Sequence, residues 1–278
     1  MIYVRLAGGL GNQLFQLAAS LLLSRRCDVP VVPIAAGLSD YETPRQPDWL
    51  RLIRSDRLQP ETGIPLHLLY SIVRGRIGRW MPRYGVSNQR FEKLVRANRL
   101  GQRMLFVDGY FQDTWMPRHL DEAVGMVRVI EPAQLRHPIE LFDCLVHIRG
   151  GDFLQYATHR FVDDRYYVHA IGVAKQHGKT CFAVLSDDAS YARQIIKSVI
   201  AVHRDITIVL LPATSDALDD FHALRFAPAR VIGNSTFAWW AAALGNRESV
   251  TWAPNQFVRD RKRGFFLQSE HVLDDWAI

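Results

Sequence analysis

The sequence predicts an α/β protein whose second half is built on a parallel, doubly wound sheet. Its 278 residues permit one large domain or two of Rossmann size, and its mix of 48% hydrophobic and 22% charged residues is typical of a soluble globular enzyme. From residue 142 onward, short apolar runs alternate with segments of helical periodicity. Strict alternation of this kind indicates parallel strands joined by crossover helices.

In the first half, we expect a strand at residues 2–7, a turn at Gly8–Gln13, a helix at Leu14–Arg26, a strand at Val29–Ile34, and a strand entering a loop at Leu105–Gln112. Between them, residues 37–103 are rich in Arg and Pro and poorly periodic. Two prolines and little periodicity at Glu131–Pro138 indicate a domain boundary. We therefore expect an N-terminal domain at 1–138, with a variable basic insert at about 40–103, and a C-terminal domain at 139–278.

In the second half, four strands and four helices are expected in alternation. They are a strand at 142–149, a helix at Asp164–His177, a strand at Cys181–Leu185, a helix at Ser190–Val199, a strand at Ile206–Leu211, a helix at Asp216–Phe226, a strand at Arg230–Gly233 and a helix starting after Asn234-Ser235.

The net charge of +6 is unevenly distributed. The segment Ser71–Arg103 carries eight arginines and Lys93 against Glu92 alone, and it follows the apolar run Pro65–Val73. The two runs together predict either a helix suited to an anionic membrane surface or a core helix followed by a solvated basic face. A basic stripe can also bind nucleic acid, but no nucleic-acid-binding motif accompanies this one.

Other features bear on the compartment. No apolar run approaches the length of a membrane span, and no signal peptide is recognisable, so we expect a cytoplasmic protein. The cysteines (Cys27, Cys144 and Cys181) are odd in number and stand in apolar contexts, which is typical of reduced core residues.

The most informative motif is His147-Ile148-Arg149-Gly150-Gly151-Asp152, which ends an apolar run. A buried strand closing in Gly-Gly places His147 and Arg149 at the carboxyl end of the strand, where open α/β sheets bind ligands. Because Ile148 separates them, their side chains should project to the same side of the strand. An imidazole and a guanidinium beside glycine backbone favour a phosphate-bearing ligand.

Three further segments carry candidate ligand groups, and the first two also have a structural alternative. Asn12 and Gln13 follow a glycine turn that lacks the third glycine of the dinucleotide fingerprint, and they can bind sugar hydroxyls or cap a helix. Asp187 and Asp188 follow a strand and can accept from a guanine or ribose or cap a helix. The third segment runs from Gly233 to Ala242 and exposes backbone N–H groups at a helix start, with Ser235 and Thr236 expected to contact a ligand and Trp240 to be structural.

Together these segments resemble glycosyltransferase family 11, the bacterial α-1,2-fucosyltransferases. The resemblance rests on five ordered motifs: Gly8–Gln16, Gly109–Gln112, His147–Asp152, Ser186–Asp188 and Gly233–Trp240. It implies a GT-B-type fold, in which two Rossmann-like domains face each other across a cleft. It also implies GDP-fucose as donor, inversion at the anomeric carbon, an acceptor-side N-terminal domain, a donor-binding C-terminal domain and no metal.

The resemblance also implies roles for individual residues. Arg149 would hold the β-phosphate, and His147 with one of Asp187 or Asp188 would read the guanine. The remaining donor-binding residues expected are Gly9, Gly11, Asn12, Gln13, Asn234, Ser235, Thr236 and Phe237. The family usually has a second arginine where this chain has Gly150, which puts donor affinity or sugar identity in question.

Departure of GDP requires a fixed cation on the leaving phosphate more than a strong nucleophile, and Arg149 fits that need. Asp152 is either the general base for the acceptor hydroxyl or an ion-pair partner that orients an arginine, and the second role is favoured. Other candidate bases are Asp108, Asp113 and His159.

We therefore expect transfer of L-fucose to a glycan hydroxyl, the 2-OH of galactose, in surface polysaccharide synthesis. The acceptor would be an oligosaccharide or a lipid-linked glycan, with the enzyme peripheral to the inner face of an anionic membrane. The alternatives are another donor sugar such as GDP-L-galactose, a non-catalytic nucleotide-sugar or glycan-binding protein, a nucleic-acid-binding protein, and a metal enzyme using His147, Asp152 and His159.

Overall fold

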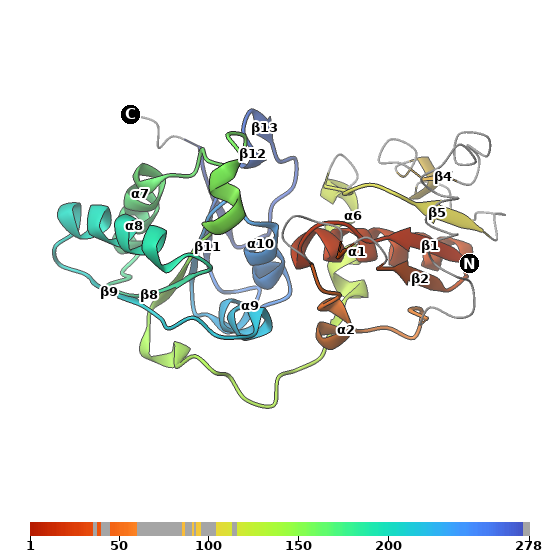
Figure 1. The fold of residues 1–278 in the computed structure, drawn as a ribbon, viewed down its shortest axis with the longest axis horizontal. Coiled ribbons are helices and arrows are strands. Elements are labelled where there is room, and N and C mark those ends of the chain that lie inside the picture. Colours follow the sequence, from red (N-terminus) through yellow and green to blue (C-terminus); the bar gives the residue numbers. More distant parts are fainter. Residues whose placement is uncertain are drawn as a thin grey trace. The chain divides into compact units, whose positions relative to one another are not determined.

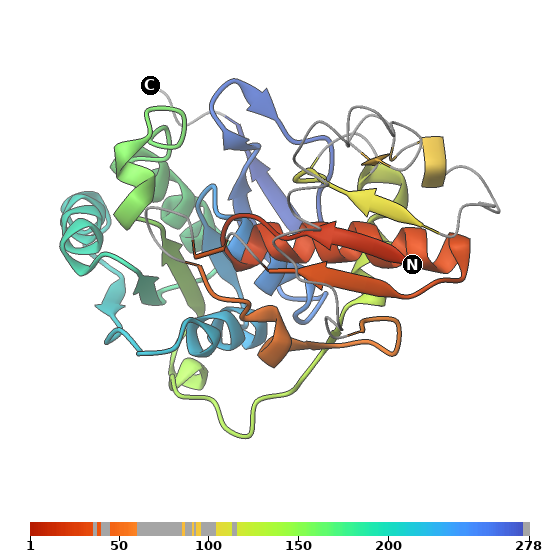
Figure 2. The same ribbon diagram turned by 45° about the vertical axis from the view of Figure 1, so that its right-hand side comes forward.

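The structure is a computed structural model that describes residues 1–35, 38–39, 45–59, 85–86, 91, 93–95, 104–112 and 116–274. The chain divides into two compact units, Met1–Glu131 and Pro132–Ile278, each with its own parallel sheet (Figures 1 and 2). The sequence placed the boundary a little later, at 138/139. Most of the basic segment Ser71–Arg103 and the apolar run before it lie outside the described residues.

The N-terminal unit holds a four-stranded parallel sheet in the order β2-β1-β5-β4. Its strands are β1 (Ile2–Arg5), β2 (Val31–Ile34), β4 (Gly85–Val86) and β5 (Leu105–Val107). The other elements of this unit are α1 (Leu10–Cys27), α2 (Trp49–Leu52), α6 (Met116–Met126) and the antiparallel pair β3 (Ile53–Arg54) and β6 (Arg128–Val129). The three strands predicted here are confirmed.

Helix α1 begins at Leu10 rather than at Leu14, so the predicted start of this helix was wrong. The turn is complete at Gly8, whose φ of 76° is left-handed, and Gly9 is the N-cap residue. Most of α1 is buried on every side, from Leu10 to Ser24. A helix buried all round has no narrow apolar stripe, and this is why periodicity did not locate its start.

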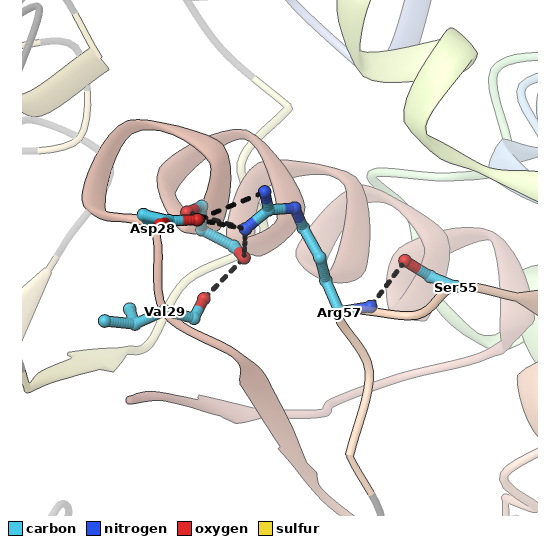
Figure 3. A network of polar contacts seen from close by, with 5 residues as sticks. Asp28, Val29, Ser55 and Arg57 are labelled. Atoms are coloured by element: carbon cyan, nitrogen blue, oxygen red, sulfur yellow. Dashed lines mark hydrogen bonds and ion pairs between the residues drawn. The ribbon is translucent and has the colours of Figure 1, made fainter.

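A polar network joins the carboxyl end of α1 to Arg57, which lies within the predicted insert at about 40–103 (Figure 3). Asp28 ends the helix in the left-handed conformation and donates its N–H to the carbonyl of Ser24. The hydroxyl of Ser24 donates to the carbonyl of Val29 at 2.5 Å, and the guanidinium of Arg57 lies 3.4 Å from the Asp28 carboxylate. The Val31 N–H in turn donates to the Arg57 carbonyl, so the network fixes the entry into β2.

The C-terminal unit holds a six-stranded parallel sheet in the order β14-β11-β10-β7-β8-β9. Its strands are β7 (Cys144–Ile148), β8 (Cys181–Ser186), β9 (Thr207–Leu210), β10 (Arg230–Ile232), β11 (Thr251–Pro254) and β14 (Glu270–Leu273). The helices are α7 (Asp164–Gln176), α8 (Ala189–Val202), α9 (Ala217–Phe226) and α10 (Thr236–Ala243). The four predicted strands, the four predicted helices and the parallel sheet are confirmed, whereas β11 and β14 were not predicted.

Short polar residues start the four helices of this unit. The side chains of Asp163, Asp188, Asp216 and Ser235 each accept a hydrogen bond from a backbone N–H of the helix that follows. Because the strands are parallel, the segments that follow β7, β8 and β10 all leave the sheet at the same edge. The sheet and its caps therefore gather the predicted motifs of this unit at one edge.

The core of the C-terminal unit is rich in large aromatic side chains. Tyr166, Tyr167, Trp239, Trp240 and Trp252 are all buried, which confirms the structural role expected for Trp240. The Tyr166 hydroxyl donates to the Ile232 carbonyl at 2.5 Å, and burial raises the pKa of this phenol well above its usual value. This hydrogen bond ties α7 to the end of β10.

Arg230 is a buried cation at the start of β10. Its guanidinium donates to the carbonyls of Leu224, Arg225 and Ser249, at 2.5, 2.8 and 3.3 Å. Burial lowers the pKa of Arg230 to about 10, and its donors are satisfied by these backbone carbonyls and by the Thr251 hydroxyl. The residue ties the end of α9 to the segment that enters β11.

Two expectations about the whole chain concern cysteines and membrane spans. Cys144 is buried and its pKa is raised by burial, while Cys27 and Cys181 are only half-buried; all three are free thiols. Within the described residues, no helix combines the length and the apolar character needed to cross a bilayer.

Candidate functional site

The end of β7 lies between the ends of β8 and β10. In the sheet register, His147 is opposite Leu185 on one side and Ile232 on the other, and Ile148 is opposite Ser186. The residues that follow each strand are therefore neighbours, although they lie 37 or more positions apart in the chain. The predicted segments of the C-terminal unit form one site at this edge.

Arg149 is held by two carboxylates. Its Nη1 lies 2.5 Å from Oδ2 of Asp187, and its Nη2 donates to Oδ1 of Asp152. The guanidinium carbon also lies 5.0 Å from the centre of the Phe153 ring. Arg149 keeps 22% of its side-chain surface exposed, so its cation is both fixed and accessible to a ligand.

Gly150 is a point of close approach between two loops. Its N–H donates to Oδ1 of Asp187 at 2.8 Å. A Cβ atom at this position would lie 2.5 Å from the Cβ of Asp188, far inside van der Waals contact. The turn before α8 therefore occupies the space into which a side chain at position 150 would point, which gives a physical reason for glycine at the position where the resemblance implies an arginine.

Asp188 has the capping role that was the structural alternative for this segment. Its Oδ1 accepts from the N–H groups of Ser190 and Tyr191, at 3.0 and 2.9 Å. The two neighbouring acids thus have different roles. Asp188 is the N-cap residue of α8, while Asp187 contacts Arg149 and Gly150.

His147 presents a buried nitrogen without a hydrogen-bond partner. The residue is 6% exposed, and its Nδ1 has no partner among the residues that the structure describes. Burial lowers the pKa of His147 to about 4, the Asp187 carboxylate raises it and the Arg149 guanidinium lowers it further. The ring is therefore neutral at pH 7 and offers a hydrogen bond rather than a charge.

The start of α10 completes the edge of the sheet next to His147. The ring of Phe237 lies 5.8 Å from the His147 ring, and Ser235 caps the helix by accepting from the Ala238 N–H. Asn234 is buried, and its amide donates to the carbonyls of His159 and Phe257. Ser235 is buried as well, whereas Thr236 and Phe237 are half-buried at the helix N-terminus.

The predicted residues of the N-terminal unit lie in the first turn of α1. Oδ1 of Asn12 accepts from Nε2 of Gln112 at 2.8 Å, which brings the first and second sequence motifs together. The N-cap of α1 is Gly9, so the alternative that Asn12 caps this helix was wrong. Gln13 is fully buried, and its amide donates to the carbonyls of Gly8 and Gln46. Gly11 is also buried inside the helix.

The candidate bases have different surroundings. Asp152 is paired with Arg149, as the favoured interpretation expected. Asp108 is 2.5 Å from Nη2 of Arg5, and Asp113 lies outside the described residues. The His159 ring centre lies 4.7 Å from that of Phe153 with the ring planes inclined at 58°; burial lowers the pKa of His159, while Asp152 raises it. Among the described residues, no group of three or more His, Cys, Asp or Glu side chains is arranged to hold a metal ion.

The structure adds three residues that contact the predicted residues of one unit or the other. Phe153 lies against the Arg149 guanidinium, Gln112 contacts Asn12, and the Tyr167 hydroxyl donates to the His147 carbonyl at 3.2 Å. Gln112 stood in a recognised motif and Phe153 directly follows Asp152, so both had a sequence signal. Tyr167 had none, because its role depends on how α7 packs on the sheet.

The match to a family model decides the classification. The sequence model described as glycosyl transferase family 11 matches residues 137–277, which include every site segment of the C-terminal unit. The chain belongs to glycosyl transferase family 11. This glycosyltransferase is also similar to two Escherichia coli proteins over nearly its whole length.

One of these relatives is named alpha-1,2-colitosyltransferase; it is 23% identical over 281 residues, and the match covers 95% of each chain. The other is named O-antigen biosynthesis glycosyltransferase WbnK; it is 24% identical over 312 residues, with 99% of each chain covered.

Solved structures agree at the level of the fold. The α-1,6-fucosyltransferase NodZ of Bradyrhizobium, in a crystal soaked with GDP-fucose, superposes with a TM-score of 0.55 at 15% identity, covering 88% of this glycosyltransferase and 92% of NodZ. POFUT1 in complex with GDP-fucose gives a TM-score of 0.53 at 12% identity, with 89% and 94% covered. The expected GT-B-type α/β fold is confirmed.

Proposed function

We propose that this glycosyltransferase transfers L-fucose from GDP-fucose to a glycan hydroxyl, the 2-OH of galactose, in the synthesis of a surface polysaccharide such as O-antigen. The observation that carries the proposal is Arg149, a cation fixed by Asp187 and Asp152 at the carboxyl edge of the sheet. Beside it, Nδ1 of His147 is buried and has no hydrogen-bond partner within the described part of the chain. The names of the two Escherichia coli relatives support a 1,2 linkage and the polysaccharide context.

The chemistry requires charge stabilisation at the leaving phosphate. The acceptor oxygen forms a bond to the anomeric carbon with inversion, while the bond from that carbon to the β-phosphate oxygen breaks and its electron pair stays on GDP. The acceptor proton passes to a base. Arg149 neutralises the charge that develops on the phosphate, and the N–H groups at the start of α10 add to this effect.

The neighbours of Arg149 have supporting roles in this proposal. Asp152 orients the guanidinium through its ion pair and is thereby less suited to act as the base. His147 stays neutral and donates or accepts a hydrogen bond at the guanine, with Phe237 beside it. Asn12, in the N-terminal unit, keeps the sugar-binding role that the family resemblance implies.

A second donor is favoured by one specific observation. A relative at 23% identity is named as a transferase of colitose rather than fucose. This glycosyltransferase also carries Gly150 where the family usually has arginine, so a GDP-activated deoxy sugar other than fucose is the competing proposal. GDP-L-galactose is a third candidate donor.

Turnover and binding by the purified protein, across a panel of nucleotide sugars and in the presence of EDTA, test the proposal. The panel contains GDP-fucose, GDP-colitose, GDP-L-galactose and UDP-galactose. We expect turnover with one GDP-sugar in EDTA and its loss in Arg149→Ala. The matched control is Arg193→Ala, which removes an exposed arginine of α8 and should retain activity. Failure to bind any GDP-sugar would refute the proposal.

Peripheral membrane contact by the basic segment is a separate proposal. The residues concerned include Arg74, Arg76 and Arg79, which lie outside the described residues. We expect the protein to sediment with anionic vesicles at low salt and the triple charge-reversal variant not to do so. Equal sedimentation of both proteins would contradict this role.

A further inference from the structure

We propose that Asp187 is a positioning residue that fixes Arg149 to the Gly150 turn, instead of reading the donor base. This inference rests on the proposed function, because it concerns how Arg149 is presented to a diphosphate.

Both oxygens of Asp187 are directed at the end of β7. Oδ1 accepts from the Gly150 N–H at 2.8 Å, and Oδ2 lies 2.5 Å from Nη1 of Arg149. Recognition of guanine by a carboxylate requires both oxygens to face the N1–H and the exocyclic amine. In Asp187 both oxygens already have protein partners on two consecutive residues.

Asp152 completes the arrangement from the other side. It accepts from Nη2 of Arg149, so each terminal nitrogen of the guanidinium is held by a different carboxylate, and Phe153 lies 5.0 Å from its carbon. Each terminal nitrogen carries two N–H groups, so one on each remains for a ligand. The planar cation is thus oriented before the donor arrives, which is what electrostatic stabilisation of a leaving group needs.

The two glycines of the motif make the approach of Asp187 sterically feasible. A Cβ at Gly150 would lie 2.5 Å from the Cβ of Asp188, and a Cβ at Gly151 would lie 3.0 Å from Oδ2 of Asp187. The φ of Gly151 is 51°, in the left-handed region that glycine adopts without strain. The Gly-Gly pair therefore admits the carboxylate to the end of β7.

Asp187→Asn separates the two contacts of this side chain. The amide oxygen can still accept from the Gly150 N–H, but the amide NH₂ cannot accept from Arg149. The full-length wild type and variant are titrated calorimetrically with GDP, GMP and IDP. The GDP-to-GMP affinity ratio reports the contact with the β-phosphate, and the GDP-to-IDP ratio reports recognition of the exocyclic amine.

We expect Asp187→Asn to lower the GDP-to-GMP ratio about tenfold and to leave the GDP-to-IDP ratio unchanged. Arg149→Lys should lower the first ratio at least as much, and the double variant should lose no more than Arg149→Lys alone, since Asp187 acts through Arg149. Asp205→Asn is the matched control. This substitution breaks an exposed ion pair with Lys175 just before β9, at the amino ends of the strands and away from the site. Both affinity ratios should stay at wild-type values.

Three results would overturn the inference. A changed GDP-to-IDP ratio with an intact GDP-to-GMP ratio would assign Asp187 to the base. An equal loss of affinity for all three nucleotides would assign it a merely structural role. Absence of nucleotide binding by the wild type would refute the proposed function itself, and the positioning role with it.

Discussion

Gly150→Ala should destabilise the C-terminal unit, because the new methyl group has no space. It would lie 2.5 Å from the Cβ of Asp188 and 3.3 Å from Cγ and Oδ2 of the same residue. Carbon atoms in contact are normally about 3.5–4.0 Å apart. The Cβ of Asp188 is fixed by the backbone, so no change of rotamer relieves the overlap. Either the end of β7 or the turn before α8 must move by about 1 Å.

The magnitude follows from what such a movement disturbs. Overpacking of this kind costs about 1–3 kcal/mol. If the turn moves, Asp188 also loses its hydrogen bonds to Ser190 and Tyr191, and the loss of an N-cap costs about 0.5–2 kcal/mol. We expect a decrease in the free energy of unfolding of about 2–4 kcal/mol, together with loss of the Arg149 contact to Asp187.

Urea unfolding of the full chain measures this effect. The control is Gly125→Ala in α6, because no atom of the described residues lies within 4 Å of a Cβ at that position and helical alanine is as stable as glycine or more so. The Gly150→Ala/Asp188→Gly double variant removes the clashing carbon while glycine remains an acceptable N-cap. It should recover at least about 1 kcal/mol relative to the sum of the single variants. Wild-type stability of Gly150→Ala, or simple additivity in the double variant, would refute the steric reasoning.

Three other predictions follow from the described contacts. Burial lowers the pKa of His147 from 6.5 to about 4, so between these pH values the unfolded chain binds a proton that the folded protein does not. The free energy of unfolding should therefore decrease as the pH drops from about 6.5 to about 4, by at most about 3 kcal/mol. Urea unfolding at pH 7.5 and pH 5 measures this slope, and His147→Gln should flatten it. An unchanged slope in the variant would show that other groups cause it. Arg230→Lys should lower the free energy of unfolding by about 2 kcal/mol or more, since an ammonium cannot reach all the carbonyls that the guanidinium satisfies; a wild-type unfolding midpoint would contradict this. Asn12→Ala and Gln112→Ala should show a coupling energy of about 1 kcal/mol in a double-mutant cycle, and strict additivity would mean that their hydrogen bond is not formed in solution.

The sequence predicted the alternating part of the C-terminal unit because each strand there is a short apolar run bounded by turn residues. It missed β11 and β14, whose residues include Trp252, Pro254 and Glu270. Glu270, at the start of β14, forms a buried ion pair with Arg263. A charged residue at the start of a run is not typical of a buried strand, so the pattern did not predict β14. The start of α1 was missed because this helix is buried on nearly all sides and therefore has no narrow apolar stripe that marks its first turn.

The sequence also predicted which residues would gather at the carboxyl edge of the sheet. Parallel strands end at one edge whatever their exact register, and therefore the order of the motifs was enough to group His147, Arg149, Asp187 and Ser235. Their individual partners could not be predicted in this way, because hydrogen bonds depend on distances of a few tenths of an ångström. The division of work between Asp187 and Asp188 is the clearest case.

The sequence by itself determined the fold class, the family and the edge of the sheet at which the chemistry groups lie, because these depend on periodicity, strand order and motifs that are local in the chain. Only the tertiary structure decided that Arg149 is held between Asp187 and Asp152, that Asp188 caps α8, and that position 150 has no space for a side chain. The Arg149–Asp187 contact and the close approach at Gly150 arise where β7 and β8 come side by side. The Gly150–Asp187 hydrogen bond joins residues 37 positions apart, and no local pattern encodes how closely two such loops approach.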